Sequence, residues 1–126
     1  MNITGMVISE ELEKITEFFD ACISQYDFSW DQVGIEDKRL QDLLHAIEFE
    51  PQAKERYKLS TKLHDSRVNR RINKDQTEVL RPLYDFLNDE RHRRSIQQLK
   101  QVLGAVRKAE KSHLFRTYHP RVEEEE

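Results

Sequence analysis

Apolar residues recur every three or four positions along most of this chain, which is the spacing of one face of an α-helix. The first run begins after Ser9, a residue suited to cap a helix start, and predicts a helix over about 10–26. The pattern breaks over 27–35, where Gly34 lies. A shorter second helix is expected over 36–49, ended by Pro51, which suits the first position of the next helix.

A third and longer helix is predicted from Gln52 to Arg81, a stretch with neither Gly nor Pro. Pro82 should bend or end this helix, because proline lacks the backbone N–H and crowds the preceding turn. A fourth helix is predicted over about 91–115. The apolar face of the fourth helix is expected along Ile96, Leu99, Leu103 and Val106. That of the third is expected along one stripe, with Leu59, Leu63 and Leu80 beside it; the stripe is Tyr57, Thr61, His64, Val68, Ile72, Val79 and Leu83.

These elements predict an all-α fold, a small helical bundle of about four helices with one long, Pro-kinked third helix. Residues 1–122 are expected to form a single helical domain, and residues 123–126 a disordered acidic tail. Of the 126 residues, 37% are hydrophobic and 36% charged, which is lean for a compact core, so self-association into a homo-oligomer is expected. No run approaches the length of a membrane span. The single cysteine, Cys22, excludes an intrachain disulfide and fits a reducing, cytoplasmic location.

Charge is strongly sorted along the chain, although the total is only −3. Residues 1–53 carry 3 Lys/Arg against 12 Asp/Glu, whereas residues 54–121 carry 18 against 8. The C-terminal four glutamates add −4. The basic half therefore predicts an anionic partner, which the total charge conceals.

The cations in this half form clusters at helical spacing, because residues i, i+3, i+4 and i+7 share one face. A face of this kind attracts the phosphate backbone of nucleic acid. We therefore expect a non-enzymatic protein that binds nucleic acid through the third and fourth helices, with no cofactor, metal or catalytic residue. The predicted contacts are Arg67, Arg70, Arg71, Lys74, Arg91, Arg93, Arg94, Arg107, Lys108 and Arg116.

Two other interpretations of the charges stay open. Acids within the third helix, such as Asp75, offer intrahelical pairs, and the acidic first half could neutralise the basic half within the monomer. Alternatively, the chain is a protein–protein module that inhibits a host enzyme by imitating a phosphate backbone. The acids of that interpretation are Glu10, Glu11, Glu13, Glu17, Glu36, Asp37 and Asp42.

Two weaker patterns point to chemistry. Glu110 and His113 form a Glu-x-x-His pair, the spacing that di-iron bundles use twice, and Asp42 and His45 form a degenerate second pair. One good pair does not make a metal site. Arg107 and His113 match the Arg-x(4–6)-His spacing of HEPN ribonucleases, a resemblance that implies an acid/base histidine beside a phosphate-steadying arginine.

Roughly half of the chain carries a further resemblance. Its residues are Asp65-Ser-Arg-x-x-Arg-Arg-x-x-Lys-Asp75, Leu80-x-Pro-Leu-Tyr-Asp-Phe-Leu87, Leu99-x-Gln-Val-Leu-Gly-x-Val-Arg-Lys-x-Glu-Lys-x-His113 and Arg116-x-Tyr-x-Pro-Arg-Val122. These segments resemble small uncharacterised helical proteins from phages and prophages of Gram-positive bacteria. The resemblance implies a small accessory protein that acts by stoichiometric binding in the host cytoplasm, and it implies no catalytic residue.

Overall fold

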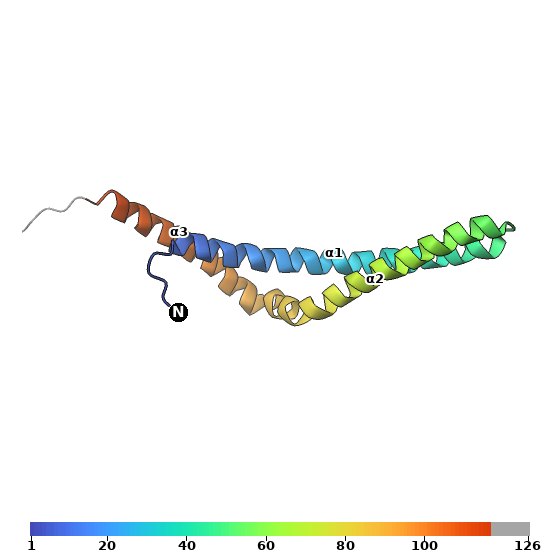
Figure 1. The fold of residues 1–126 in the computed structure, drawn as a ribbon. Coiled ribbons are helices and arrows are strands. Elements are labelled where there is room, and N and C mark those ends of the chain that lie inside the picture. Colours follow the sequence, from blue (N-terminus) through green and yellow to red (C-terminus); the bar gives the residue numbers. More distant parts are fainter. Residues whose placement is uncertain (117–126) are drawn as a thin grey trace, which may run out of the picture.

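The structure, a computed structural model, describes residues 1–116, and these residues form three α-helices and no strand. Helix α1 spans Ile8–Phe49, α2 spans Ala53–Asn88 and α3 spans Glu90–Leu114. The all-α class is confirmed, but the expectation of about four helices was wrong. In Figure 1, α2 returns beside α1, and α3 continues in the same general direction until it meets the first turns of α1. The predicted acidic tail lies outside the described residues.

The two short helices predicted in the first half are one continuous helix of 42 residues, about 63 Å long. Gly34 does not break it, because one glycine in a helix interior costs only about 1 kcal/mol. The face that α1 presents to its partners also continues through the predicted break, along Tyr26, Ser29, Val33 and Glu36. Since two of these residues are polar, the apolar periodicity alone did not show this.

Helix α2 likewise continues through Pro82 and ends at Asn88 rather than near Arg81. The break comes at Asp89, whose backbone is extended (φ −65°, ψ 135°). The Asp89 carboxylate accepts a hydrogen bond from the amide of Arg91 at 2.9 Å, which caps the start of α3. Of the two effects expected of Pro82, bending or ending the helix, the second does not occur, and the helix ends instead just before the capping aspartate.

All three helices pack along rows in which three- and four-residue steps alternate, the 3.5-residue repeat of coiled coils. We call these rows the seam, and each of its members is buried or half-buried. The seam comprises Phe19, Cys22, Tyr26, Ser29, Val33, Glu36, Leu40, Leu43 and Ile47 of α1, Leu59, Leu63, Ser66, Arg70, Asn73, Thr77, Leu80, Tyr84 and Leu87 of α2, and His92, Ile96, Leu99, Leu103, Val106 and Glu110 of α3.

The seam of α2 is not the row expected from the sequence. Leu59, Leu63 and Leu80 are half-buried in the seam, whereas Tyr57, Val68 and Ile72 of the expected row are exposed. Both rows recur at helical spacing, so spacing alone could not decide between them. The row beginning at Leu59 keeps a strict 3.5-residue repeat, which lets it follow a neighbouring helix over its whole length.

The core along this seam is thin and unusually polar. Among the described residues, the buried hydrophobic side chains are Cys22, Val33, Leu87 and Leu103, and seven buried residues are polar or charged. Where α2 approaches its end, Tyr84 stacks on Tyr26 with ring centroids 3.9 Å apart, and its hydroxyl donates to Asp27 at 3.1 Å. The hydrogen bond to Asp27, together with burial, raises the pKa of Tyr84.

Replacing Gly34 by alanine should raise the free energy of unfolding by about 1 kcal/mol. Gly34 lies inside α1, and a methyl group added there meets no atom within 4 Å. Urea-induced unfolding followed by circular dichroism measures the change. An unchanged or lowered stability would contradict a continuous α1.

Candidate interaction site

A buried carboxylate joins the middle of α1 to α2. Glu36 is 1% exposed, and its oxygens accept hydrogen bonds from the Ser66 hydroxyl, from Asn69 Nδ2 at 3.0 Å and from Arg39 Nη1 at 2.5 Å. Burial by itself would raise the pKa of Glu36, but the bonds from Ser66 and Asn69 and the charge of Arg39 outweigh it, so the pKa is lowered. The cluster holds an ionised carboxylate in the seam and aligns α1 with α2.

Acidic side chains of α1 pair with basic side chains of the other two helices along the length of the molecule. Arg70 Nε lies 2.6 Å from Asp37 Oδ1, Lys100 Nζ lies 3.1 Å from Asp20 Oδ2, and Arg107 Nη2 lies 2.8 Å from Glu13 Oε2. The sorting of charge along the sequence therefore becomes pairing between antiparallel helices. Exposed pairs of this type stabilise a fold by only about 0–1 kcal/mol each.

The structure distributes the predicted nucleic-acid contacts over different environments. Arg67 and Arg70 approach Asp37, Arg71 approaches Asp75, Arg91 approaches Asp89, Arg94 approaches Glu90, and Arg107 approaches Glu13. Lys74 lies 5.5 Å from the centre of the Trp30 ring, a cation–π contact. Arg93 donates to Asn88. Lys108 and Arg116 are exposed on α3 and just after its end.

The ten cations are thus not one uniform face. Arg67, Arg70 and Arg107 form ion pairs with acids of α1, and Lys74 makes a cation–π contact with Trp30. By contrast, the three arginines that open α3 have partners only from residues 88–90, beside them in sequence. The start of α3 is therefore a cluster of predicted contacts without an ion pair to a described acid of α1, and Arg71, Lys108 and Arg116 are single cations in the same situation.

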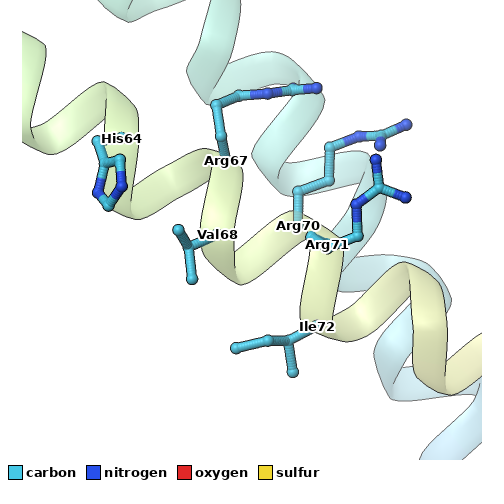
Figure 2. A pocket seen from close by; sticks show the side chains of 6 residues that line it. All are labelled: His64, Arg67, Val68, Arg70, Arg71 and Ile72. Atoms are coloured by element: carbon cyan, nitrogen blue, oxygen red, sulfur yellow. The ribbon is translucent and has the colours of Figure 1, made fainter.

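The side of α2 that faces away from α1 carries large apolar side chains that no other described helix covers. We call this set the outer stripe: Tyr57, Val68, Ile72 and Val79, with 75, 47, 62 and 77% of each residue exposed. Figure 2 shows Val68 and Ile72 projecting away from α1, while Arg67 and Arg70 project towards it. The shallow depression drawn there is lined by α2 alone, so it is a surface and not an enclosed cavity.

Glu110 has a structural role that its sequence pattern did not suggest. Its carboxylate accepts hydrogen bonds from the Ser9 amide at 2.9 Å and the Ser9 hydroxyl at 2.7 Å. Ser9 is inside α1 rather than at its cap position, which is Val7 and has no side-chain cap bond. The expectation that Ser9 caps the first helix was wrong, and Glu110 of α3 supplies an acceptor at this helix start instead.

The patterns that pointed to chemistry do not converge in space. Glu110 lies beside Ser9, whereas Asp42 lies about 50 Å further along α1. Within residues 1–116, no group of three or more metal-ligating side chains is present. Arg107 is paired with Glu13, and His113, six positions later, lies about 120° away around the helix. This placement gives the HEPN hypothesis no support.

The comparisons with known proteins do not identify a relative: no family model, curated protein or solved structure matches this chain. The resemblance to phage proteins therefore stays a prediction. No helix in the described part of the chain is long and apolar enough to cross a membrane.

The Glu36 cluster predicts a specific pH dependence of stability. Because the pKa of Glu36 is lowered from its usual 4.5 on folding, its contribution is complete above that value and is lost as the pH falls through the lower, folded-state pKa. Glu36→Gln should cost about 1–3 kcal/mol at neutral pH and flatten the acid limb of the profile. Urea unfolding at several pH values measures this, with Glu17→Gln, an exposed acid of α1, as control. Equal acid sensitivity in wild type and Glu36→Gln would contradict the assignment.

Proposed function

We propose that this chain acts without catalysis, by stoichiometric binding of a protein partner along the outer stripe of α2. The observation that carries the proposal is the exposure of the four residues of the outer stripe, of which Figure 2 shows Val68 and Ile72 on the side of α2 away from α1. Isolated exposed apolar residues are ordinary, but these four follow one face of a single helix. An exposed apolar surface bordered by charged side chains is typical of protein–protein contact sites.

The total surface of the molecule supports a partner as well. A compact monomer of 15.2 kDa exposes about 7,100 Å², whereas this chain exposes 10519 Å². The difference of roughly 3,400 Å² is several times the ~800 Å² that each partner buries in a standard protein interface.

Two titratable groups with a shifted pKa have structural partners. The pKa is shifted for Glu36 and Tyr84, and both have structural partners that account for the shift. Each joins α1 to α2 within the seam. Both shifts are therefore explained by contacts that hold the two helices together.

A photo-reactive amino acid placed on the outer stripe tests the proposal. In cells that naturally produce the chain, a benzophenone side chain at position 72 or 79 should form a protein adduct of defined mass. The same residue at position 62, an exposed lysine site on another side of α2, should give much less. Gel electrophoresis with mass spectrometry reads out the adducts. Equal labelling from all three positions, or no protein adduct, would contradict a partner on this stripe.

Contact with a nucleic-acid backbone is a second candidate function, and it rests on the start of α3. Arg91 and Arg94 expose 85 and 73% of their side chains, and their ion-pair partners, Asp89 and Glu90, are also accessible to solvent. Exposed ion pairs exchange readily with other anions because each is worth little. Arginine also binds phosphate in bidentate geometry, which suits it to this role.

Removing Arg91, Arg93 and Arg94 together by alanine substitution should weaken binding of duplex DNA or RNA by about tenfold or more at low salt, and reduce the salt dependence by about 0.9 for each lost phosphate contact. Electrophoretic mobility shift at several salt concentrations measures this. A triple variant at Lys14, Lys38 and Lys54 makes the same change of net charge elsewhere. Absence of binding by the wild type, or equal losses in both variants, would count against this candidate.

A further inference from the structure

We infer that the side of α3 opposite its seam is a recognition surface for duplex DNA, which lies in the major groove with its glutamines directed at adenine bases. This inference rests on the second candidate function, because it names the kind of nucleic acid and the part of α3 that meets the bases. We call this side the outer face of α3. Its members are all exposed, and they are Arg94, Gln97, Gln98, Gln101, Gly104, Ala105, Lys108 and Ser112.

The segment from Arg91 to Leu114 carries almost no negative charge. It contains seven lysines and arginines and a single acid, Glu110. The Glu110 carboxylate is turned into the seam, where it accepts hydrogen bonds from the amide and the hydroxyl of Ser9. Glu90, the first residue of α3, pairs with Arg94 at 2.8 Å at one end of the outer face. The rest of the outer face therefore has no carboxylate on α3 that would repel phosphate.

The centre of the outer face allows another molecule to approach the helix backbone closely. Gly104 and Ala105 have the smallest side chains, and they lie between Gln101 and Lys108. Glycine is among the poorest helix formers. Packing within the described chain does not require it, because a methyl group at Gly104 would meet no atom within 4 Å. A partner that approaches at this point accounts for a glycine in the middle of an exposed face.

Three glutamines next to this centre are suited to distinguish one base pair from another. A glutamine amide accepts a hydrogen bond from the N6 amino group of adenine and donates one to N7, and both adenine groups are reached from the major groove. Gln97, Gln98 and Gln101 lie within about 60° of the middle of the outer face. All three can therefore be directed at base edges while the helix lies in the groove.

Cations at the ends and on the flanks of the outer face fit the phosphates that border the groove. Arg94 and Lys108 are about 21 Å apart along α3. Arg91 lies on one flank of the outer face and Lys111 on the other, each about 80° from its middle. The two flanks would therefore approach the phosphates of opposite strands, which sets the register of the helix, while the glutamines contact the bases.

The size of the groove favours DNA over RNA. The major groove of B-form DNA is about 12 Å wide and admits an α-helix, whereas that of A-form RNA is deep and narrow and excludes side chains. Helix α1 packs on the seam of α3 and so lies on the side away from the groove. In Figure 1 the last turns of α3 extend past the start of α1, which leaves this part of α3 open.

A large side chain at Gly104 tests the inference without weakening the helix. Gly104→Leu replaces a poor helix former by a good one, so the stability should be kept or raised. Because leucine fills the centre of the outer face, the variant should bind a fixed duplex DNA of about 20 bp about tenfold or more weakly at low salt. Gly34→Leu makes the same change at an exposed, equally open position of α1 and should leave the affinity unchanged. Fluorescence anisotropy gives the affinity, and urea unfolding gives the stability.

Selection from a library of random duplex DNA tests the role of the glutamines. The wild-type chain should enrich duplexes that share an adenine-containing motif. The double variant Gln98→Ala/Gln101→Ala should lose this preference but bind the fixed duplex within about threefold of wild type, because the phosphate contacts remain. An RNA duplex of the same sequence as the fixed DNA should bind the wild type about tenfold or more weakly.

Three results would overturn the inference: an unchanged DNA affinity of Gly104→Leu, equal affinities for the DNA and RNA duplexes, or a selection without an adenine-containing motif. None of these removes the second candidate function as long as the triple arginine variant at the start of α3 still weakens binding. Absence of binding to any nucleic acid would remove both. The protein partner on the outer stripe is judged separately, by the adducts from positions 72 and 79.

Discussion

Two helices lying side by side can shield only the strip along which they touch, and most features of this protein depend on that constraint. Helix α1 meets α2 and then α3 in succession, so at most positions along the rod each helix has one neighbour. One half of every helix remains towards solvent, whatever its sequence. The protein consequently has a thin seam, a large surface and apolar side chains on faces that no other part of the described chain reaches.

A thin seam also changes what determines the alignment of the helices. Many seam residues, such as Ser29, Asn73 and Thr77, are small or polar and do not specify one register by shape alone. The Glu36 cluster distinguishes the observed register from its neighbours, because sliding α2 by one turn would deprive a buried carboxylate of the donors Ser66 and Asn69. The ion pairs beside the seam also favour the observed alignment, although each contributes little. Together they hold the acidic α1 against the basic α2 and α3.

The sequence predicted the helical class and the bounds of α3 well, because α3 has an apolar seam and a capping aspartate next to its start. It predicted α1 poorly. Ser29 and Glu36 occupy seam positions, and hydrogen bonds make them compatible with burial: Gln25, one turn earlier on α1, donates to Ser29, and Ser66 of α2 donates to Glu36. Apolar periodicity cannot show such bonds. On α2 the outer stripe was recognised as a pattern but assigned to the core. Two competing rows on one helix can be ranked only when the neighbouring helix is known.

The candidate site could also be predicted only in part from the sequence. The clustering of arginines could be predicted from spacing, but their partners on α1 could not, since Arg70 and Asp37 are 33 positions apart. The hydrogen bonds from Ser66 and Asn69 to Glu36 could likewise be predicted only once α1 and α2 were known to lie side by side.

The bond between Glu110 and Ser9 has a consequence for the order in which the chain folds. It joins residues 101 positions apart, so it forms only after α2 and α3 have returned along α1. Until then the first turn of α1 lacks a side-chain acceptor of its own at Val7, and its free amides favour fraying. The hairpin of α1 and α2 can therefore assemble first, from its turn outwards. The bond between the first turn of α1 and the last turns of α3 forms last.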